Sequence, residues 1–364
     1  MSATGTILTI NPGSTSTKLA IFSYSTMPRE VQLSKEQILD LKVSDTPLHD
    51  QLDERLNQIE AFLLNEDVTP DLIMSRSAPL QPMEGGTYIV NELMLAQIRS
   101  LRFADHASNL GPLMGARLAE KFKIPVYISD PITTDEFQDI ARISGVPEIQ
   151  RRSRSHALNI KASARRVCET MGLAFRESQW IVAHLGGGIS IAAVQNGRIT
   201  DVNDALLGMG PFSPERAGAL PLEGLLDLVF SSDLSPAALK RKLSKESGLK
   251  AYLGTADLRL IEARIDQGDE HAELIFQAMI YQISKEMAAM ASTLHFKLDG
   301  FIITGGMAQS PEVCQQLEKN FSTLAPVYIQ PGEYEGLALA EAGLRILSGD
   351  ETPKHYSTDS QRSK

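Results

Sequence analysis

The sequence predicts an α/β protein built of two domains with a cleft between them. The chain has 364 residues, more than a single hydrophobic core usually serves. Apolar runs of strand length alternate with helix-patterned segments in both halves. A strand, a glycine-containing turn and a second strand follow one another near the N-terminus, and the same arrangement returns near residue 185.

The first half opens with a predicted hairpin. Residues 7–10 form an apolar strand pattern and residues 17–22 a second strand pattern, and a turn of glycine, proline and hydroxyl side chains separates them. Apolar residues then recur at three- and four-residue steps, which predicts a helix over 48–64. Further strands are expected at 71–74 and 126–129, and further helices at 91–101 and 109–122.

The second half repeats the pattern. We expect helices at 159–171 and 273–294 and strands at 180–183, 190–194, 198–202 and 299–304. The methionine stripe of the long helix predicts core packing. Ser310 and Pro311 are a capping residue and a first-turn proline, so another helix should begin there. The tail, 349–364, is polar and predicted to be disordered.

These patterns predict a first domain over 1–155, completed by a segment near 336–348, and a second domain over 156–335.

Lys and Arg number 35 and Asp and Glu 45, a net charge of −10 that argues against binding nucleic acid or an anionic membrane. Cys168 and Cys314 lie far apart and are expected to be buried thiols in a reducing compartment. With no leader and no apolar run of spanning length, the protein is expected in the cytoplasm.

Three glycine-containing segments have the composition of phosphate or nucleotide sites. The turn 11–18 offers hydroxyls, backbone N–H groups and Lys18, although a solvated hairpin turn is the competing interpretation. In the segment 184–188, His184 precedes three glycines that let the backbone approach a ligand closely. The strand 301–304 ends in Gly305 and Gly306 before a helix N-terminus, a frequent site for phosphate groups.

Two hairpin loops followed by a late strand, two glycines and a helix resemble the nucleotide signature shared by sugar kinases, actin and heat-shock chaperones. Among proteins with this signature, the chain most resembles the butyrate kinases of the acetokinase family. The resemblance implies an actin-like, ribonuclease H-like ATPase fold. The matching stretches cover the chain from end to end in the family's order: 7–22, 82–88, 105–115, 129–137, 184–221, 301–310 and 331–343.

The resemblance also implies roles for individual residues. Residues expected to touch the phosphates of ATP are Asn11, Ser14, Ser16, Lys18, His184, Gly186, Gly187 and Gly188. Residues expected beside the adenosine are Asp257, Arg259, Gly305 and Gly306. Residues expected to act on the acid and the transferring phosphoryl are Arg76, His106, Asp130, His156 and Arg216. Glu335, with Asp130, is expected to hold magnesium.

Each of these residues also has a structural interpretation. Arg76 could be a surface charge, His106 a satisfied core histidine, and Asp130 a turn former before Pro131. His156 could be a helix-cap neighbour within a basic patch, and the metal carboxylate could be Glu333 or Glu341 in place of Glu335.

The acyl pocket departs from the family pattern in one place. Ser77-Ala78-Pro79 follows Arg76, where butyrate kinases commonly carry glycines, and this leaves the chain-length preference open. Ser155 precedes His156, where acetate kinases tend to carry an aromatic residue. The smaller side chain favours a longer acyl group.

The predicted function is a reversible phosphoryl transfer between ATP and butyrate that forms butyryl phosphate and ADP. Two arginines can grip carboxylate and phosphoryl oxygens, and an ionised carboxylate needs no general base. Alternatives are a kinase for acetate, propionate or a branched acid, or a non-catalytic nucleotide sensor. The resemblance further implies a homodimer or a higher homo-oligomer.

Overall fold

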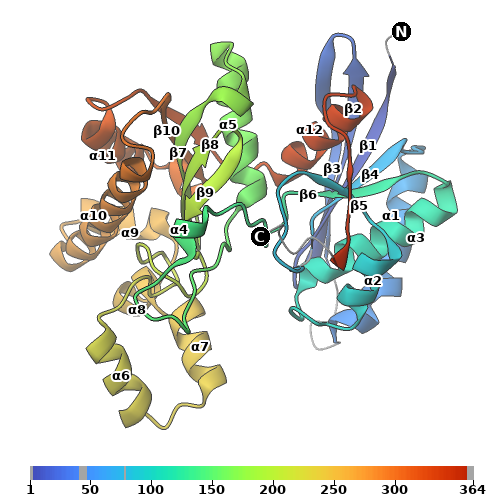
Figure 1. Ribbon diagram of the computed structural model, residues 1–364. Helices are drawn as coiled ribbons and strands as arrows, with labels where there is room; N and C mark the ends of the chain where they lie inside the picture. The colour runs from blue at the N-terminus through green and yellow to red at the C-terminus, as the bar shows by residue number, and fades with distance from the viewer. Residues whose placement is uncertain (1–2, 41–46, 78, 359–364) are drawn as a thin grey trace. The chain divides into compact units, whose positions relative to one another are not determined.

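The computed structural model describes residues 3–40, 47–77 and 79–358, which form two compact units (Figure 1). Unit 1 comprises Met1–Thr134 and Tyr334–Lys364, and unit 2 comprises Asp135–Glu333. Each unit is an open β-sheet with helices on both faces, as expected for an α/β protein.

The units divide earlier than the predicted boundary at residue 155. Glu136 and Lys161 form an ion pair at 2.9 Å that is almost completely buried in unit 2. The same carboxylate oxygen, Glu136 Oε2, accepts a hydrogen bond from the Ile199 N–H at 2.8 Å. Phe137 packs into the core of the same unit. These interactions attach the chain to unit 2 from residue 135 onward.

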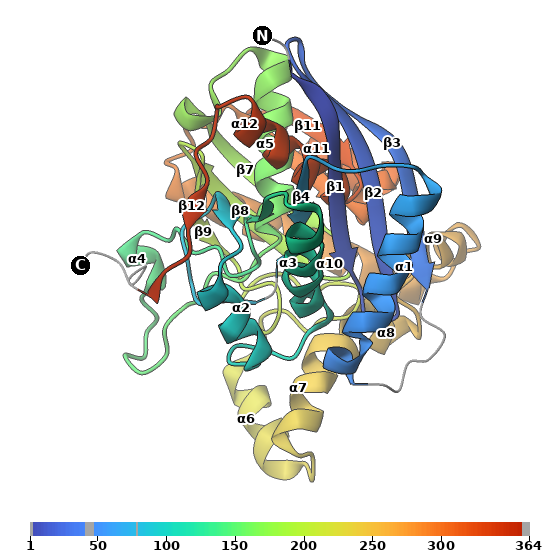
Figure 2. The same ribbon diagram turned by 90° about the vertical axis from the view of Figure 1, so that its right-hand side faces the viewer.

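Unit 1 contains a seven-stranded sheet in the order β12-β5-β6-β4-β1-β2-β3. Its strands are β1 (Thr4–Pro12), β2 (Ser16–Thr26), β3 (Arg29–Asp40), β4 (Leu72–Ser75), β5 (Thr87–Ile89), β6 (Val126–Ser129) and β12 (Lys354–His355). Its helices are η1 (Leu48–Gln51), α1 (Leu52–Asn65), α2 (Glu92–Arg99), η2 (Ala107–Asn109), α3 (Leu110–Phe122) and α12 (Glu335–Leu347). Helices α1 to α3 cover one face of the sheet, the face seen in Figure 2, and α12 covers the other.

The core of unit 1 explains its apolar strands. Ile7, Leu8 and Ile10 are fully buried because helices cover both faces of β1. The predicted hairpin is confirmed, with β1 and β2 paired antiparallel from Thr4–Ser25 to Pro12–Thr17. The sequence did not predict β3, an edge strand whose charged and mostly exposed side chains lack an apolar face.

Two predictions for unit 1 need correction. The helix expected over 48–64 begins as the 3-10 turn η1, and the α-helix starts only at Leu52.

The tail expected to be disordered is ordered through much of its length. Its strand β12 pairs with β5, and Tyr356 is buried against α2, where its hydroxyl donates to Gln97. The tail carries one buried aromatic residue and a strand of two residues. An apolar pattern this short could not predict that the tail packs against the rest of unit 1. Residues 359–364 lie outside the described part of the chain.

Unit 2 contains a five-stranded sheet in the order β11-β10-β7-β8-β9. Its strands are β7 (Gln179–Leu185), β8 (Ile189–Gln195), β9 (Arg198–Val202), β10 (Gly300–Gly305) and β11 (Val327–Pro331). Its helices are α4 (Asp139–Arg142), α5 (Ala157–Met171), η3 (Phe175–Glu177), α6 (Leu222–Ser231), α7 (Pro236–Lys245), α8 (Gly248–Leu253), α9 (Leu258–Asp266), α10 (Glu270–Thr293), η4 (Gly306–Gln309) and α11 (Pro311–Phe321).

Alternate residues of the central strands fill two cores in unit 2. Ile181 and Ala183 face α10 and α11, whereas Trp180 and Val182 face α5. The methionine stripe of α10 is buried in the first of these cores, as predicted. Both cysteines are buried and free.

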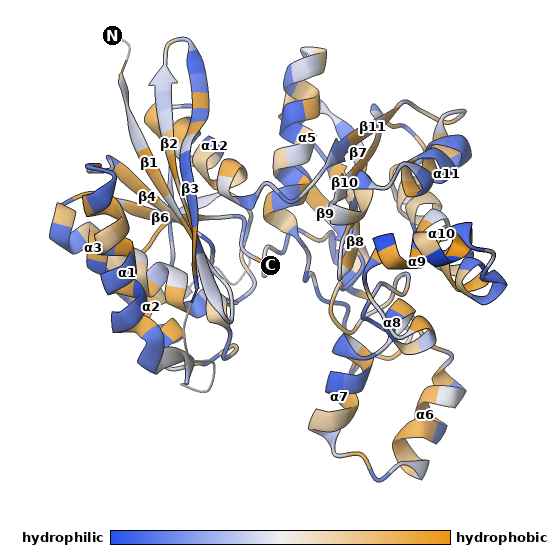
Figure 3. Ribbon diagram, turned by 180° about the vertical axis from the view of Figure 1, so that it is seen from behind, coloured by the Kyte–Doolittle hydropathy of each residue, from blue (hydrophilic) through white to orange (hydrophobic). Residues whose placement is uncertain are grey.

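Helix α6 differs from the other long helices of unit 2. It is coloured as largely hydrophobic in Figure 3, yet none of its residues is buried. In the described part of the chain, no helix has both the length and the apolar character needed to cross a bilayer.

Candidate active site

The first predicted phosphate loop joins β1 to β2. A hydrogen bond from the Gly13 N–H to the Ser16 carbonyl closes the turn, and Gly13, Ser14 and Thr15 are exposed. Lys18 pairs with Glu36 of β3 at 3.1 Å on the surface. The loop therefore presents hydroxyls and backbone groups to solvent, which suits a phosphate but also describes a solvated turn.

Three of the predicted site residues meet in unit 1. The Asn11 amide nitrogen donates to Glu335 Oε2 at 2.6 Å, and Arg76 Nη1 lies 3.0 Å from the same oxygen. Arg76 Nη1 also donates to Asn11 Oδ1 at 3.3 Å. Asn11, Arg76 and Glu335 thus form a closed polar triangle. We call it the unit 1 triangle.

The fold brings this triangle together. β1 and β4 are parallel neighbours, so Asn11 and Arg76 lie at their carboxyl ends, where side chains of α/β proteins form sites. The Arg76 N–H donates to the Ile10 carbonyl at 2.9 Å. Glu335 is the first residue of α12, and the positive end of the helix dipole stabilises its carboxylate.

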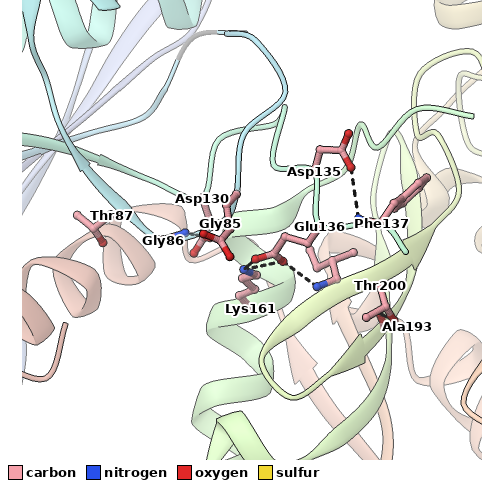
Figure 4. A network of polar contacts seen from close by, with 12 residues as sticks. Gly85, Gly86, Thr87, Asp130, Asp135, Glu136, Phe137, Lys161, Ala193 and Thr200 are labelled. Carbon is pink, nitrogen blue, oxygen red and sulfur yellow. Dashed lines mark hydrogen bonds and ion pairs between the residues drawn. The ribbon is translucent and has the colours of Figure 1, made fainter. Parts of the chain in front are cut away.

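Asp130 follows β6 and is almost fully buried. Its backbone has a φ of 39°, a left-handed conformation uncommon for aspartate. The carboxylate accepts a hydrogen bond from the Gly86 N–H at 2.8 Å, and the Asp130 N–H donates to the Gly86 carbonyl at 3.1 Å (Figure 4). The loop that carries Gly86 therefore positions the carboxylate.

His106 is exposed, so it is not the core histidine considered above. It caps the short η2 turn, with Nδ1 accepting a hydrogen bond from the Ser108 N–H at 3.2 Å. That acceptor role places the ring proton on Nε2 when the imidazole is neutral.

Unit 2 brings together a second group of predicted residues around the glycine turn Gly186–Gly188. His184 and Leu185 belong to β7, so the turn is shorter than the predicted 184–188. The rings of His156 and His184 stack with centroids 3.9 Å apart. His156 Nδ1 lies 2.9 Å from Ser190 Oγ, and His184 Nδ1 lies 2.9 Å from Asn159 Oδ1.

Glu333, which the sequence offered only as an alternative to Glu335 for the metal, lies beside His184. Glu333 Oε1 is 3.2 Å from the buried His184 Nε2, in an alignment that does not make a hydrogen bond. A Cβ at Gly186 would lie 2.7 Å from the same oxygen, so glycine leaves room for this carboxylate. His184 Nδ1 donates to Asn159 Oδ1, because an amide oxygen only accepts.

Arg216 lies against the same turn. A Cβ at Gly188 would be 2.0 Å from Arg216 Nη1, so only glycine leaves room for the guanidinium. Nη1 donates a short hydrogen bond to the Ala205 carbonyl. Burial lowers the pKa of Arg216, while the charges of Glu215 and Asp204 oppose that shift. The guanidinium is therefore held rigidly and carries a cationic charge out of full solvent contact.

Of the four predicted adenosine residues, Asp257 and Arg259 lie at the start of α9, and Gly305 and Gly306 lie where β10 ends. Asp257 caps α9 through the Arg259 N–H and forms an ion pair with the Arg259 guanidinium at 2.7 Å. The Arg259 hydrogen bond lowers the pKa of Asp257. Gly305 has a φ of 92° and approaches Leu185 closely, so it must be glycine, whereas Gly306 faces open space. The turn η4, which begins at Gly306, lies between β10 and α11, and the sequence did not predict it.

The residues that sequence reasoning missed are Asn159 and Ser190. Ser190 is the first hydroxyl after the glycine turn, and its neighbour Ile189 begins β8, so its place in the predicted strand could have pointed to it. Asn159 is a polar residue within the buried face of α5, where it also accepts from Thr304 Oγ1 at 3.1 Å. A buried amide on an apolar helix face is the signal that identifies it.

The carboxylates of unit 1 provide the oxygen ligands that magnesium prefers. Glu335 and Asp130 are candidates, and within the described ranges no cluster of three or more acidic, histidine or cysteine side chains could hold a metal alone. A magnesium ion bound through one or two carboxylates, phosphate oxygens and water fits this donor set.

Comparison with known proteins gives one consistent family. A family model described as the acetokinase family matches residues 148–338. A protein of Enterococcus faecalis named "Probable butyrate kinase" is 42% identical over 353 residues, covering 97% of this chain and 98% of that protein. A protein of Coprothermobacter proteolyticus with the same name is 43% identical over 355 residues, covering 96% and 99%.

Solved structures show the same fold at low identity. Porphyromonas gingivalis acetate kinase matches with a TM-score of 0.76 and 19% identity, covering 94% of this chain and 100% of that one. A propionate kinase from Francisella tularensis matches with a TM-score of 0.74 and 17% identity, covering 93% and 98%. The predicted fold class is thereby confirmed.

Proposed function

The chain belongs to the acetokinase family, and we propose on that basis that it is an ATP-dependent butyrate kinase. The proposed reaction transfers the γ-phosphoryl group of ATP to butyrate, reversibly, and gives butyryl phosphate and ADP. The observation that carries the proposal is identity above 40% over nearly the whole chain to relatives named as butyrate kinases. Such a reaction makes the protein a phosphotransferase with a carboxyl group as acceptor.

The proposed chemistry needs little covalent help from the protein. A carboxylate oxygen of butyrate attacks the γ-phosphorus, a new O–P bond forms, and the bond to the ADP oxygen breaks. Because the carboxylate is already ionised near neutral pH, no proton has to be removed. Catalysis then consists of positioning two anionic reactants and stabilising the charge that spreads over the phosphoryl oxygens.

We propose that Arg76 and Arg216 provide this positioning. Arginine presents parallel N–H groups that match carboxylate and phosphoryl oxygens, which lysine cannot do. In the unit 1 triangle, Asn11 and Glu335 hold the Arg76 side chain. Gly188 and the Ala205 carbonyl hold that of Arg216. Both arginines are therefore pre-organised, which supports a substrate-binding role.

His156 would stabilise the transferring phosphoryl, and its partner Ser190 and the stacked His184 fix the ring that would do so. His106 would bind near the substrates. The residues proposed to bind the nucleotide phosphates are Asn11, Ser14, Ser16, Lys18, His184, Gly186, Gly187 and Gly188. Those proposed to bind the adenosine are Asp257, Arg259, Gly305 and Gly306.

Magnesium, when bound, would neutralise part of the charge on the phosphate chain. We propose Glu335 as its holder, with Asp130 orienting the ion or its waters. The Asp130 carboxylate is tied to the Gly86 N–H, and this attachment favours an orienting role over a base role.

The proposal includes a cytoplasmic location and a homodimer. The free buried cysteines are typical of a reducing compartment. The exposed apolar stripe of α6 supports association with a second copy of the chain.

The direct test incubates purified protein with ATP, magnesium, butyrate and hydroxylamine and measures the acyl hydroxamate. We expect hydroxamate to form, with butyrate preferred to acetate by about tenfold or more, because each added methylene contributes about 1–3 kcal/mol. No hydroxamate from any short-chain acid would end the proposal. A preference for acetate, propionate or a branched acid would reassign the substrate.

For the Arg216→Ala variant we expect ATP binding without turnover; loss of ATP binding alone would favour a nucleotide sensor.

A further inference from the structure

Arg55 of α1 is a fully buried arginine in unit 1 that the proposed chemistry leaves without a role. In the described ranges no carboxylate forms an ion pair with its guanidinium, although the neighbouring charge of Glu54 acts on it. A buried cation without an acidic partner is expensive unless every N–H finds an acceptor. Its presence therefore calls for a reason outside packing.

The acceptors of Arg55 are almost all in the first phosphate loop. Its Nη2 donates to the Gly13 and Ser14 carbonyls at 3.0 and 3.2 Å. Its Nη1 donates to the Ser16 carbonyl at 2.9 Å and to Thr17 Oγ1 at 2.8 Å. Gln51 Oε1 accepts from Nη2 at 2.8 Å and from Nε at 3.2 Å, which fixes the guanidinium from behind.

These contacts determine which way the loop peptides face. Cis peptide bonds in the described chain are confined to Met27-Pro28, so the loop peptides are trans. In a trans peptide the carbonyl and the following N–H point in opposite directions. Because the Gly13 and Ser14 carbonyls point inward to Arg55, the N–H groups of Ser14 and Thr15 point outward. Neither of these N–H groups donates to another described residue.

We propose that Arg55 is a positioning residue for the nucleotide: it holds two successive peptides with their N–H groups outward, as an anion-binding concavity for the phosphate chain of ATP. The guanidinium also places a cation, shielded from water, behind those N–H groups. This inference rests on the proposed function, since it takes the anion to be the phosphate chain of the kinase substrate. It goes beyond that function in assigning the loop geometry to a residue that does not touch substrate.

The test compares Arg55→Lys and Arg55→Met with the wild-type chain. Lysine keeps the positive charge but has too few N–H donors for the four loop acceptors. Methionine keeps only the aliphatic part of the side chain. Binding of pyrophosphate and of MgATP is measured by calorimetry, and KM for ATP and for butyrate by the hydroxamate assay. We expect both variants to weaken pyrophosphate and ATP binding about ten- to a hundredfold, a range set by the loss of one or two charged hydrogen bonds. KM for butyrate should change far less.

Ile59→Ala is the matched control. Ile59 lies one turn beyond Arg55 on α1 and is fully buried in the apolar core, where its side chain has no polar group to hold the loop carbonyls. Its variant should lower the melting temperature and leave ATP affinity unchanged. Addition of methylguanidinium to Arg55→Ala should restore part of the ATP affinity, an effect that a general loss of stability would not show.

The outcomes separate this inference from the proposed function. Wild-type ATP and pyrophosphate affinity in Arg55→Lys would overturn the positioning role while leaving butyrate kinase activity in place. Absence of hydroxamate with intact, Arg55-dependent pyrophosphate binding would reject the activity and retain the inference. If Arg55→Met does not fold, Arg55→Lys and Gln51→Met, which removes the support behind the guanidinium, decide the question. A wild-type chain that binds neither pyrophosphate nor ATP would also overturn the inference.

Discussion

Arg76 and Glu335 form an ion pair, with Nη1 3.0 Å from Oε2, and Asn11 bonds to both side chains. The family resemblance implied separate tasks for these residues, one toward the acid and one toward magnesium. Their contact would make the two proposed tasks depend on one another. Displacing Glu335 toward a metal would free the Arg76 guanidinium for a substrate oxygen, so the pair is suited to couple metal binding to substrate binding.

Replacement of Arg76 by lysine should therefore impair catalysis more than stability. We expect kcat/KM for butyrate to fall about ten- to a hundredfold, because a charged hydrogen bond contributes about 1.5–3 kcal/mol. The pair is partly exposed, so unfolding free energy should change by less than about 1 kcal/mol. The hydroxamate assay and chemical denaturation measure the two effects.

Glu335→Gln serves as the partner variant. It should raise the magnesium concentration needed for half-maximal activity and leave KM for ATP at saturating magnesium closer to that of the wild type. A purely structural ion pair would instead give both variants the same loss of stability and no change in magnesium dependence.

Gly188→Ala should reproduce part of the activity loss expected for Arg216→Ala. The added methyl group would lie 2.0 Å from Arg216 Nη1, a contact that forces the guanidinium out of place. We expect kcat to fall about a hundredfold, because displacement of a positioned group by about 1 Å can cost that much. The unfolding temperature should change little if the guanidinium moves into solvent.

Gly187→Ala is the informative comparison in the same turn. Its methyl group would meet Glu215 at 3.5 Å, an ordinary contact. A smaller loss at position 187 than at 188 would support the steric argument. Equal losses of activity would show that glycine is needed for the conformation of the whole turn and not for the space that Arg216 occupies.

The sequence predicted the apolar elements of both sheets well because their pattern is local. β6 has the predicted bounds, and the strands on either side of both glycine turns were found. The charged edge strand β3 and the docked tail were missed. Their positions depend on pairing with distant strands and not on a local apolar pattern.

The candidate site was predictable in its residues but not in its geometry. Motif matching pointed to Asn11, Arg76 and Glu335 separately, and only the fold shows that they touch. Arg55 was overlooked although it lies on the apolar face of the predicted helix, three residues after Leu52 and four before Ile59. An arginine on such a face has to find acceptors, and that need was a usable signal.

Acid should remove a specific part of the stability of unit 1. Burial raises the pKa of Glu351, but the charge and hydrogen bond of Arg345, with the Thr87 N–H, outweigh burial and lower that pKa below 4.5. The unfolded chain therefore binds the proton more readily than the folded one. The stability from the ionised carboxylate is complete above pH 4.5 and is lost as the pH falls through the folded pKa.

Glu351→Gln tests this contribution. It leaves the partly buried Arg345 without its charged partner, so we expect a loss of about 2–3 kcal/mol at pH 7. Denaturation curves of both chains at pH 7 and near pH 4 should show the difference narrowing in acid. A difference that is constant with pH would contradict the assignment.

The docking of the C-terminal tail can be tested at Tyr356. Its ring is buried and its hydroxyl donates to Gln97 of α2. Tyr356→Phe should cost about 1 kcal/mol for the hydrogen bond, and Tyr356→Ala about 3–5 kcal/mol for the cavity. Unchanged stability in the alanine variant would mean that the tail does not pack against unit 1 in solution.

The homodimer implied by the family resemblance can be tested at α6. Leu222, Leu226, Val229 and Phe230 fall at steps of four, three and one residues, so they share one helix face, and each is at least 40% exposed. Apolar area of this kind favours association, since burying it removes it from water.

We expect Phe230→Asp to shift the protein to a smaller species in sedimentation velocity. Leu274→Asp, which places the same charge on an exposed leucine of α10, should not do so. If the wild-type chain already sediments as a monomer, the homodimer is wrong and the stripe on α6 requires another explanation.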